Sequence, residues 1–119
     1  MKTTTSKQAQ PENPFVGTWH IYEMELWDED YFNMETQAYL EIGPNHLGEF
    51  QFGLVSGSLD GNVEPLGERE RFAFTWEGQD EMDPASGSGW LQLTRKDEAE
   101  GLIKLHLGDR STFKARKVS

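Results

Sequence analysis

The sequence predicts an all-β domain, a single antiparallel up-and-down barrel of about eight strands. β-Branched and aromatic residues recur in short runs with alternating apolar positions, which is typical of strands. Turn-forming residues separate these runs at intervals of roughly ten residues, which favours a barrel or a sandwich. No segment keeps a helical period over the length of a helix. Closure into a barrel is favoured because it removes exposed sheet edges.

Residues 1–13 form a polar segment in which Met1 is the one large apolar residue. Such a segment cannot bury enough apolar surface to offset the loss of chain entropy on ordering. We therefore expect a disordered polar tail, 1–13, followed by one barrel domain, 14–119. Dense packing residues begin at Pro14-Phe15-Val16-Gly17-Thr18-Trp19, where we place the first strand with Trp19 plugging one end of the barrel.

The first strand, within residues 15–27, alternates imperfectly. Trp19 and Ile21 share one parity, whereas Met24 and Leu26 share the other. A bulge near Glu23 would turn all four apolar side chains inward. Without the bulge Glu23 would point into the barrel, where an unpaired carboxylate is costly. We therefore expect the bulge.

The later strands are more regular. Segment 71–76 is the clearest, with Phe72, Phe74 and Trp76 on one side, and segment 49–54 places Phe50 and Phe52 together. We expect these five aromatic side chains to face one common interior. The remaining strands are expected at 38–42, 58–63, 89–94, 102–107 and 112–118.

Turns are expected where glycine, proline and small polar residues gather. Residues 28–33 are expected to form a loop or one helical turn. Residues 55–57 are predicted as a tight turn, 78–88 as the longest connection and 95–101 as a charged turn. Leu107 is expected to share an inward parity with Ile103 and Leu105. The other turns are expected at 43–46, 65–68 and 108–109.

Two motifs at opposite ends of the barrel segment resemble a known superfamily. Phe15-Val16-Gly17-Thr18-Trp19 is similar to the Gly-x-Trp opening of the calycins, which include lipocalins, fatty-acid-binding proteins and avidins. Phe113-Lys114-Ala115-Arg116 resembles their closing strand, whose arginine packs over that tryptophan. The resemblance implies a calycin-like barrel in which Gly17, Trp19 and Arg116 are structural residues. Arg116 has the opposite parity to Phe113 and Ala115, which conflicts with an inward position.

The resemblance implies a fold and no particular ligand. The chain lacks the lipocalin Thr-Asp-Tyr loop motif and the Arg-x-Tyr carboxylate clamp of fatty-acid-binding proteins. It also resembles small uncharacterised bacterial proteins that carry Trp-Glu-Gly-x-Asp-Glu-Met-Asp-Pro.

The net charge of the chain limits the classes of partner that it is expected to bind. The formal net charge is −10, which argues against nucleic acid and anionic membranes as partners and favours cations or basic proteins. Cysteine is absent, which excludes disulfides and thiolate metal sites and fits a reducing compartment. No signal-peptide or membrane-helix pattern is present. We expect a cytoplasmic protein.

Catalytic and cofactor motifs are not evident. His20, His46 and His106 lie on separate elements, whereas a zinc site needs three or four converging ligands. Ser56 lacks the Gly-x-Ser-x-Gly pattern of a nucleophile elbow. There is no phosphate loop and no dinucleotide fingerprint. We therefore expect no catalytic residues, no metal and no cofactor, and a protein that is not an enzyme.

Two acidic clusters are the strongest functional signal. Residues 28–30 and residues 80–83 each gather three carboxylates, without the spacing and glycine of an EF-hand loop. In an eight-stranded up-and-down barrel, both segments are odd-numbered connections and lie at the end opposite Trp19. Ligands enter at barrel mouths, so we predict an acidic mouth there. The predicted ligand-binding residues are Trp27, Asp30, Tyr31, Trp76, Asp80 and Asp83.

Two functions remain open. The first is a non-catalytic module that binds a small apolar or cationic molecule at this mouth. The alternative is a protein–protein interaction module that presents its acidic surface to a basic protein, with the barrel filled by side chains. An eight-stranded barrel is just wide enough either to be filled or to hold one small ligand.

Overall fold

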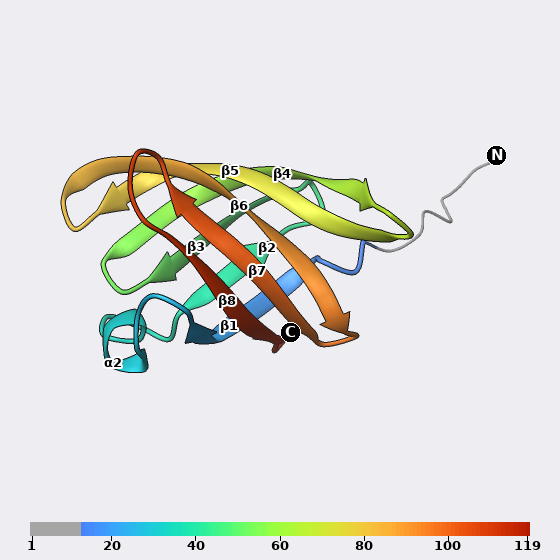
Figure 1. The fold of residues 1–119 in the computed structure, drawn as a ribbon, viewed down its shortest axis with the longest axis horizontal. Coiled ribbons are helices and arrows are strands. Elements are labelled where there is room, and N and C mark those ends of the chain that lie inside the picture. Colours follow the sequence, from blue (N-terminus) through green and yellow to red (C-terminus); the bar gives the residue numbers. More distant parts are fainter. Residues whose placement is uncertain (1–12) are drawn as a thin grey trace.

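Each strand of the barrel pairs with the next along the chain, and β1 pairs with β8 to close it (Figure 1). The computed structural model describes residues 13–119. All the pairings are antiparallel, which confirms the predicted fold class. The elements are β1 (Gly17–Met24), α2 (Glu29–Phe32), β2 (Tyr39–Ile42), β3 (Leu47–Phe52), β4 (Val55–Leu66), β5 (Arg69–Asp80), β6 (Asp83–Arg95), β7 (Glu98–Leu105) and β8 (Arg110–Lys117).

The expected tail lies outside the described residues apart from Asn13. The Asn13 side-chain oxygen accepts a hydrogen bond from the Phe15 amide at 2.9 Å, and its carbonyl accepts one from Val16 at 3.2 Å. No helix in segment 13–119 is long and apolar enough to cross a membrane.

The interior is lined by the five aromatic side chains expected there. Phe50, Phe52, Phe72, Phe74 and Trp76 are each at most 4% exposed, which confirms their common interior. Rings from neighbouring strands contact one another, as the Phe50 and Trp76 centroids do at 5.0 Å in an edge-on arrangement. The other large buried side chains include Trp19, Ile21, Leu40, Ile42, Leu59, Leu91, Ile103 and Phe113.

The predicted bulge is present in β1. The register against β8 shifts between Ile21 and Glu23, so that Trp19, Ile21 and Met24 are all buried. Glu23 stays outside, where it forms an ion pair with Lys114 at 3.5 Å. The expectation for Leu26 was wrong, because β1 ends at Met24 and Leu26 is 48% exposed.

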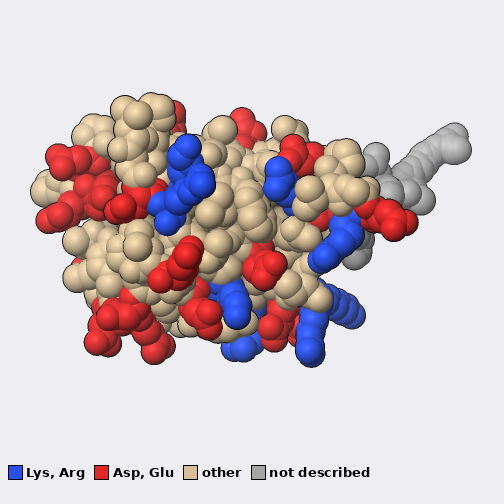
Figure 2. All heavy atoms as spheres, viewed as in Figure 1, with Lys and Arg blue, Asp and Glu red and all other residues tan. Residues whose placement is uncertain are grey.

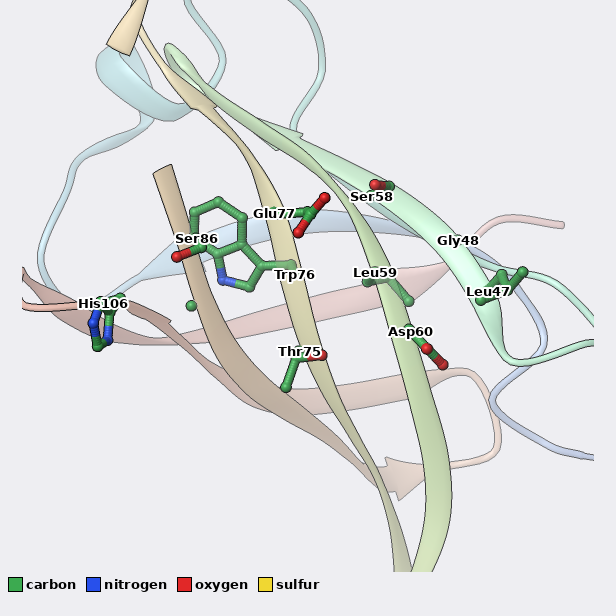
Figure 3. A pocket seen from close by; sticks show the side chains of 11 residues that line it. Leu47, Gly48, Ser58, Leu59, Asp60, Thr75, Trp76, Glu77, Ser86 and His106 are labelled. Carbon is green, nitrogen blue, oxygen red and sulfur yellow. The ribbon is translucent and has the colours of Figure 1, made fainter. Parts of the chain in front are cut away.

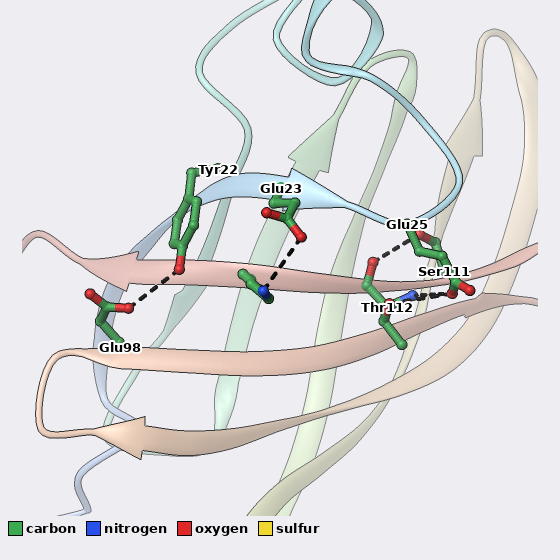
Figure 4. Close-up of polar contacts among 7 residues, drawn as sticks. Tyr22, Glu23, Glu25, Glu98, Ser111 and Thr112 are labelled. Atoms are coloured by element: carbon green, nitrogen blue, oxygen red, sulfur yellow. Dashed lines mark hydrogen bonds and ion pairs between the residues drawn. The ribbon is translucent and has the colours of Figure 1, made fainter.

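Polar contacts on the outer wall join β1 to β7 and β8 (Figure 4). The Tyr22 hydroxyl donates to Glu98 at 3.3 Å, and the Thr112 hydroxyl donates to Glu25 at 3.3 Å. The buried Ser111 hydroxyl accepts the Leu26 amide hydrogen at 3.0 Å. These bonds fix the chain as it leaves β1 for α2.

Side chains cover both ends of the barrel. At one end the Trp19 indole N–H donates to the Phe15 carbonyl at 3.0 Å, and both residues are buried. At the other end the connection 25–38 folds inward and buries Phe32, whose carbonyl accepts the Gly53 amide hydrogen at 2.9 Å. Gly17 is required near the first end, because its φ is +141° and a side chain there would collide with the Ser119 carbonyl and Lys117.

Several predicted turns are shorter or lie elsewhere. The turn expected at 55–57 is at residues 53–54, and β4 begins at Val55. The long connection expected at 78–88 is a two-residue turn, Glu81-Met82, between β5 and β6. The turn expected at 95–101 is limited to Lys96-Asp97. Leu107, expected inside, sits on the β7–β8 turn and is 93% exposed.

Two hairpins extend beyond the closed barrel. Among the described residues, β4 pairs with β3 only as far as Asp60, so 62–66 are paired with β5 alone. At the other end, β6 pairs with β7 from Gly87 onwards, so 83–86 are paired with β5, with one further bond from the His106 amide to the Ser86 carbonyl. The β5–β6 hairpin therefore has one open strand edge, on β6. The tip of the β4–β5 hairpin is open on both strands, because β5 pairs with β6 only from Phe72 onwards.

Candidate functional site at the acidic end

The two acidic clusters lie at the same end of the barrel. The β1–β2 connection and the β5–β6 turn are both opposite the end covered by Trp19, as the strand order requires (Figure 1). Figure 2, viewed as Figure 1, shows Asp and Glu gathered at the left end, whereas most Lys and Arg lie towards the middle and the right. We call this end the acidic end. The carboxylates of its two acidic clusters are Asp28, Glu29, Asp30, Asp80, Glu81 and Asp83.

Two of the predicted ligand-binding residues form part of the cover over this end. Trp27 is half-buried, with its ring centroid 5.0 Å from that of Phe52 and 5.8 Å from that of Tyr31. The Tyr31 hydroxyl accepts a hydrogen bond from the Leu54 amide at 3.4 Å. Both rings are therefore held by the barrel, and each keeps a part of its surface exposed.

Tyr31 also links the two acidic segments. Burial is the main cause that raises the pKa of its phenol, and the Asp80 and Glu81 carboxylates raise it further, against the lowering effect of the Leu54 hydrogen bond. The Leu54 backbone joins the two segments, because its amide donates to the Tyr31 hydroxyl and its carbonyl accepts the Glu81 amide hydrogen at 2.9 Å. The structure thus brings Tyr31 close to the predicted residue Asp80.

The carboxylates of the α2 segment have local roles. Asp28 is the N-cap of α2, and its side chain accepts the Tyr31 amide hydrogen at 3.2 Å. Glu29 and Asp30 occupy the first turn, where negative charge is favoured. Asp30 is exposed. Asp80 and Asp83 are directly opposite each other beside the β5–β6 turn, so two like charges flank it.

Trp76 does not belong to this end. It is 3% exposed, and its indole N–H donates to the Lys104 carbonyl at 3.1 Å. The ring is packed inside the barrel wall rather than at a mouth. The structure therefore brings together Trp27, Tyr31 and Asp80, keeps Asp30 and Asp83 exposed at the same end, and separates Trp76 from them.

Exposed apolar side chains at the acidic end were missed by the sequence analysis. Met82 is 91% exposed on the β5–β6 turn, and Leu107 is 93% exposed on the β7–β8 turn. Leu26 and Met34, from the β1–β2 connection, are 48% and 51% exposed. The sequence does carry a signal for both turn residues. Met82 is flanked by acidic residues, and Leu107 directly precedes the turn-forming pair Gly108-Asp109.

A hollow on the outer wall was also missed. It has a volume of about 680 Å³ and crosses β3 to β6, with Leu47 at one side and His106 at the other (Figure 3). Ser58, Thr75 and Ser86 give it small hydroxyl-bearing side chains, and Asp60 and Glu77 give it carboxylates. Sequence alone shows small outward residues on these strands, but not that they adjoin.

The described residues offer few ways to hold a metal. Among residues 13–119, no group of three or more His, Cys, Asp or Glu side chains is placed to bind an ion.

No protein-family model, curated protein or solved structure matches the chain.

Proposed function

We propose that this protein is a non-catalytic binding module that docks a basic partner protein through its acidic end. One observation carries the proposal: Met82 and Leu107 are almost fully exposed on two turns at the end where six carboxylates gather. Large apolar side chains at turn tips, surrounded by charge, are typical of a protein-interaction surface with an apolar centre and a polar rim.

The energetics of such a contact are consistent with specific docking. Full burial of a Met or Leu side chain contributes about 1.5–3 kcal/mol. The surrounding carboxylates would attract a basic surface, raise the association rate and exclude acidic competitors. Binding should therefore weaken with salt, because exposed charges are screened.

The large aromatic side chains of the interior favour a protein partner over an internal ligand. Phe50, Phe52, Phe72, Phe74 and Trp76 occupy the interior, and the two ends are covered by Phe15 with Trp19 and by Phe32 with Trp27.

A small cationic molecule at the acidic end is the second candidate. The half-buried rings of Trp27 and Tyr31 lie 5.8 Å apart, and Asp80 acts on the Tyr31 phenol. An aromatic surface beside carboxylates is a favourable environment for an ammonium group. This candidate predicts binding of spermine with an affinity similar to that of a basic peptide.

The test uses a fluorescein-labelled amphipathic peptide of alternating Leu and Lys clusters, with the Lys replaced by Glu as the control peptide. We expect anisotropy to detect the basic peptide only, with weaker binding at high salt. Met82→Ser with Leu107→Ser should weaken binding at least tenfold, whereas Leu66→Ser, at the opposite end, should not. Leu66 is 37% exposed on β4 and supplies the matched control.

Charge variants complete the test. Neutralising Asp80, Glu81 and Asp83 to their amides should weaken binding, and Glu68→Gln with Glu70→Gln, near the β4–β5 turn, should not. Equal losses in the two charge variants would reject a specific acidic end. Tight spermine binding that depends on Trp27 would favour the small-molecule candidate.

The calycin relationship is part of the same proposal. The sequential order of eight strands, the buried Trp19 and its Phe15 bond support it. The absence of cysteine supports a reducing compartment such as the cytoplasm.

A further inference from the structure

Three adjoining hollows form one trough across the outer wall of the barrel. The hollow of about 680 Å³ shares Ser58, Glu77 and Ser86 with a second of about 450 Å³ that reaches Pro84. It shares Leu47 with a third of about 360 Å³ that is lined by Glu41 and Glu49. We call these three hollows the acidic trough. It runs from the base of the β5–β6 hairpin across to β2.

The centre of the trough is one row of directly opposed residues. Register pairs Glu41 with Glu49, Glu49 with Ser58, Ser58 with Glu77, and Glu77 with Ser86, so the row crosses β2 to β6. All five side chains are exposed on the outer face. Figure 3 shows Ser58, Glu77 and Ser86 following one another across the strands. Four strand spacings make the row about 19 Å long.

The row carries three carboxylates, of which Glu49 accepts a hydrogen bond from the Tyr39 hydroxyl at 3.3 Å. Glu41 and Glu49 are directly opposite on adjacent strands, an arrangement of like charges that destabilises a sheet. Lys and Arg are missing from the described lining of all three hollows. A cationic occupant would relieve this repulsion.

Two prolines hinder the addition of a peptide as an extra strand to the barrel. A peptide can add to a free strand edge, but Pro65 and Pro84 lie on the free edges of the two protruding hairpins. Pro65 comes one position before the pair that closes the β4–β5 turn, and Pro84 comes one position after the pair that closes the β5–β6 turn. Both therefore lie in pairs whose backbone groups point away from the partner strand, and their nitrogens offer no donor at the edge. A partner segment would instead lie across the strands, where the hydroxyls of Ser58 and Ser86 can bond its backbone.

We infer that the acidic trough binds an extended, Lys- or Arg-containing segment of a partner protein. This inference rests on the proposed function and names the form of the partner. Glu49 and Glu77 are two strands apart, a distance of about 10 Å. Side chains three residues apart in a polyproline II segment lie about 9 Å apart on one face. The bound segment therefore carries basic residues at every third position.

The test uses a fluorescein-labelled nine-residue peptide of Ser and Pro with Lys at every third position, and the same peptide with Glu in place of Lys. Anisotropy and amide chemical-shift changes are measured at low salt on the full chain. Glu49→Gln with Glu77→Gln should weaken binding of the Lys peptide about tenfold. The matched control, Glu23→Gln with Glu100→Gln, removes two exposed strand carboxylates on β1 and β7 and should change binding less than twofold.

A second variant tests the trough without removing a carboxylate. Thr75→Arg places bulk and positive charge at an exposed position of the central hollow and should also weaken binding about tenfold. Shift changes confined to β2–β6 support the trough. Equal losses in the trough and control pairs would mean non-specific attraction and would overturn it.

The two proposals fail differently. If neutralising Asp80, Glu81 and Asp83 weakens the amphipathic peptide while the trough variants leave the Lys-repeat peptide unaffected, the trough is rejected and the acidic end stands. If the wild-type protein binds neither peptide, both are rejected.

Discussion

Lys117, and not Arg116, places its charge over Trp19. The Lys117 ammonium is 5.8 Å from the centre of the indole ring, and the two residues are directly opposite each other on β1 and β8. Arg116 has the opposite parity, so it lies on the outer wall, 4.6 Å above the Tyr22 ring and 4.0 Å from Glu98. The calycin resemblance implied that Arg116 packs over Trp19, but Lys117, the next residue, occupies that position. The alternation of Phe113 and Ala115 inward explains the difference.

The first prediction separates these two cations. Lys117→Ala should lower the free energy of unfolding by about 1 kcal/mol, since it removes both the side-chain stem and the charge from Trp19. Lys117→Met keeps the stem and should cost about half of that. Arg116 is half-exposed, so Arg116→Ala should cost less than about 1 kcal/mol. Urea unfolding measures all three, and a larger cost for Arg116→Ala would contradict the assignment.

The second prediction concerns the packed interior. Phe74 is 4% exposed, and its ring centroid is 6.1 Å from that of Phe72. Phe74→Ala should cost about 3–5 kcal/mol, through lost burial and the cavity that remains. Thr75→Ala, at the next, exposed position, should cost less than about 0.5 kcal/mol. Similar stabilities of the two variants in urea would mean that Phe74 is not part of a packed core.

The alternating strands could be predicted from sequence, but glycine misled the placement of turns. Gly57 and Gly87 suggested breaks in the chain, yet both lie within strands and face the Trp76 ring. A side chain at Gly57 would collide with Trp76, and one at Gly87 would collide with Trp76 and the Lys104 carbonyl. These glycines make room for large inward rings. The need for that room arises from the neighbouring strand, which single-sequence patterns do not reveal.

The acidic end was predictable because strand parity alone places odd-numbered connections together. Trp76 was misplaced for the same reason that 78–88 was expected to be a loop, since its strand continues to Asp80 and keeps the ring inside. The acidic trough was not predictable. It depends on the register of five strands, which brings Glu41, Glu49 and Glu77 into one row.

The third prediction follows from the Tyr31 phenol. Burial, with Asp80 and Glu81, raises its pKa in the folded protein above the ordinary value of 10.0. The folded state therefore holds the phenolic proton more tightly than the unfolded state. This contribution to stability is complete below pH 10 and is lost as pH rises through the folded-state pKa.

Tyr31→Phe should therefore reduce the fall in stability at alkaline pH. Urea unfolding of wild-type and variant proteins from pH 8 upward measures the difference. Tyr39 also has a pKa raised mainly by burial, so part of the alkaline slope remains in the variant. Identical slopes for the two proteins would show that Tyr31 does not contribute.

The fourth prediction concerns the free hairpin edges. Pro65 and Pro84 deny an outward-facing donor to another strand, a device by which natural sheets avoid edge-to-edge association. Pro65→Thr with Pro84→Thr should cause self-association that increases with concentration. Pro44→Thr, in the β2–β3 turn, is the control. Light scattering after size-exclusion chromatography reports the mass, and a double variant that keeps the wild-type mass would argue against this role.

The last prediction uses the conformation of Leu107. Its φ is +61°, a left-handed conformation that costs an L-residue about 1–2 kcal/mol, and its side chain is 93% exposed. The exposed leucine side chain makes no packing contact that would offset this backbone strain. Leu107 therefore lowers the stability of the isolated protein. Asparagine tolerates the same conformation more readily. Leu107→Asn should therefore raise the free energy of unfolding by about 0.5–1 kcal/mol.

The same substitution should weaken binding of the amphipathic basic peptide, because the apolar contact at the acidic end is lost. A loss of about tenfold corresponds to about 1.4 kcal/mol. Leu66→Asn is the control, since Leu66 lies at the opposite end of the barrel and is not among the residues with positive φ. A variant that becomes more stable and binds less well would mean that Leu107 is kept for docking. A variant that becomes more stable with unchanged binding would remove Leu107 from the proposed surface.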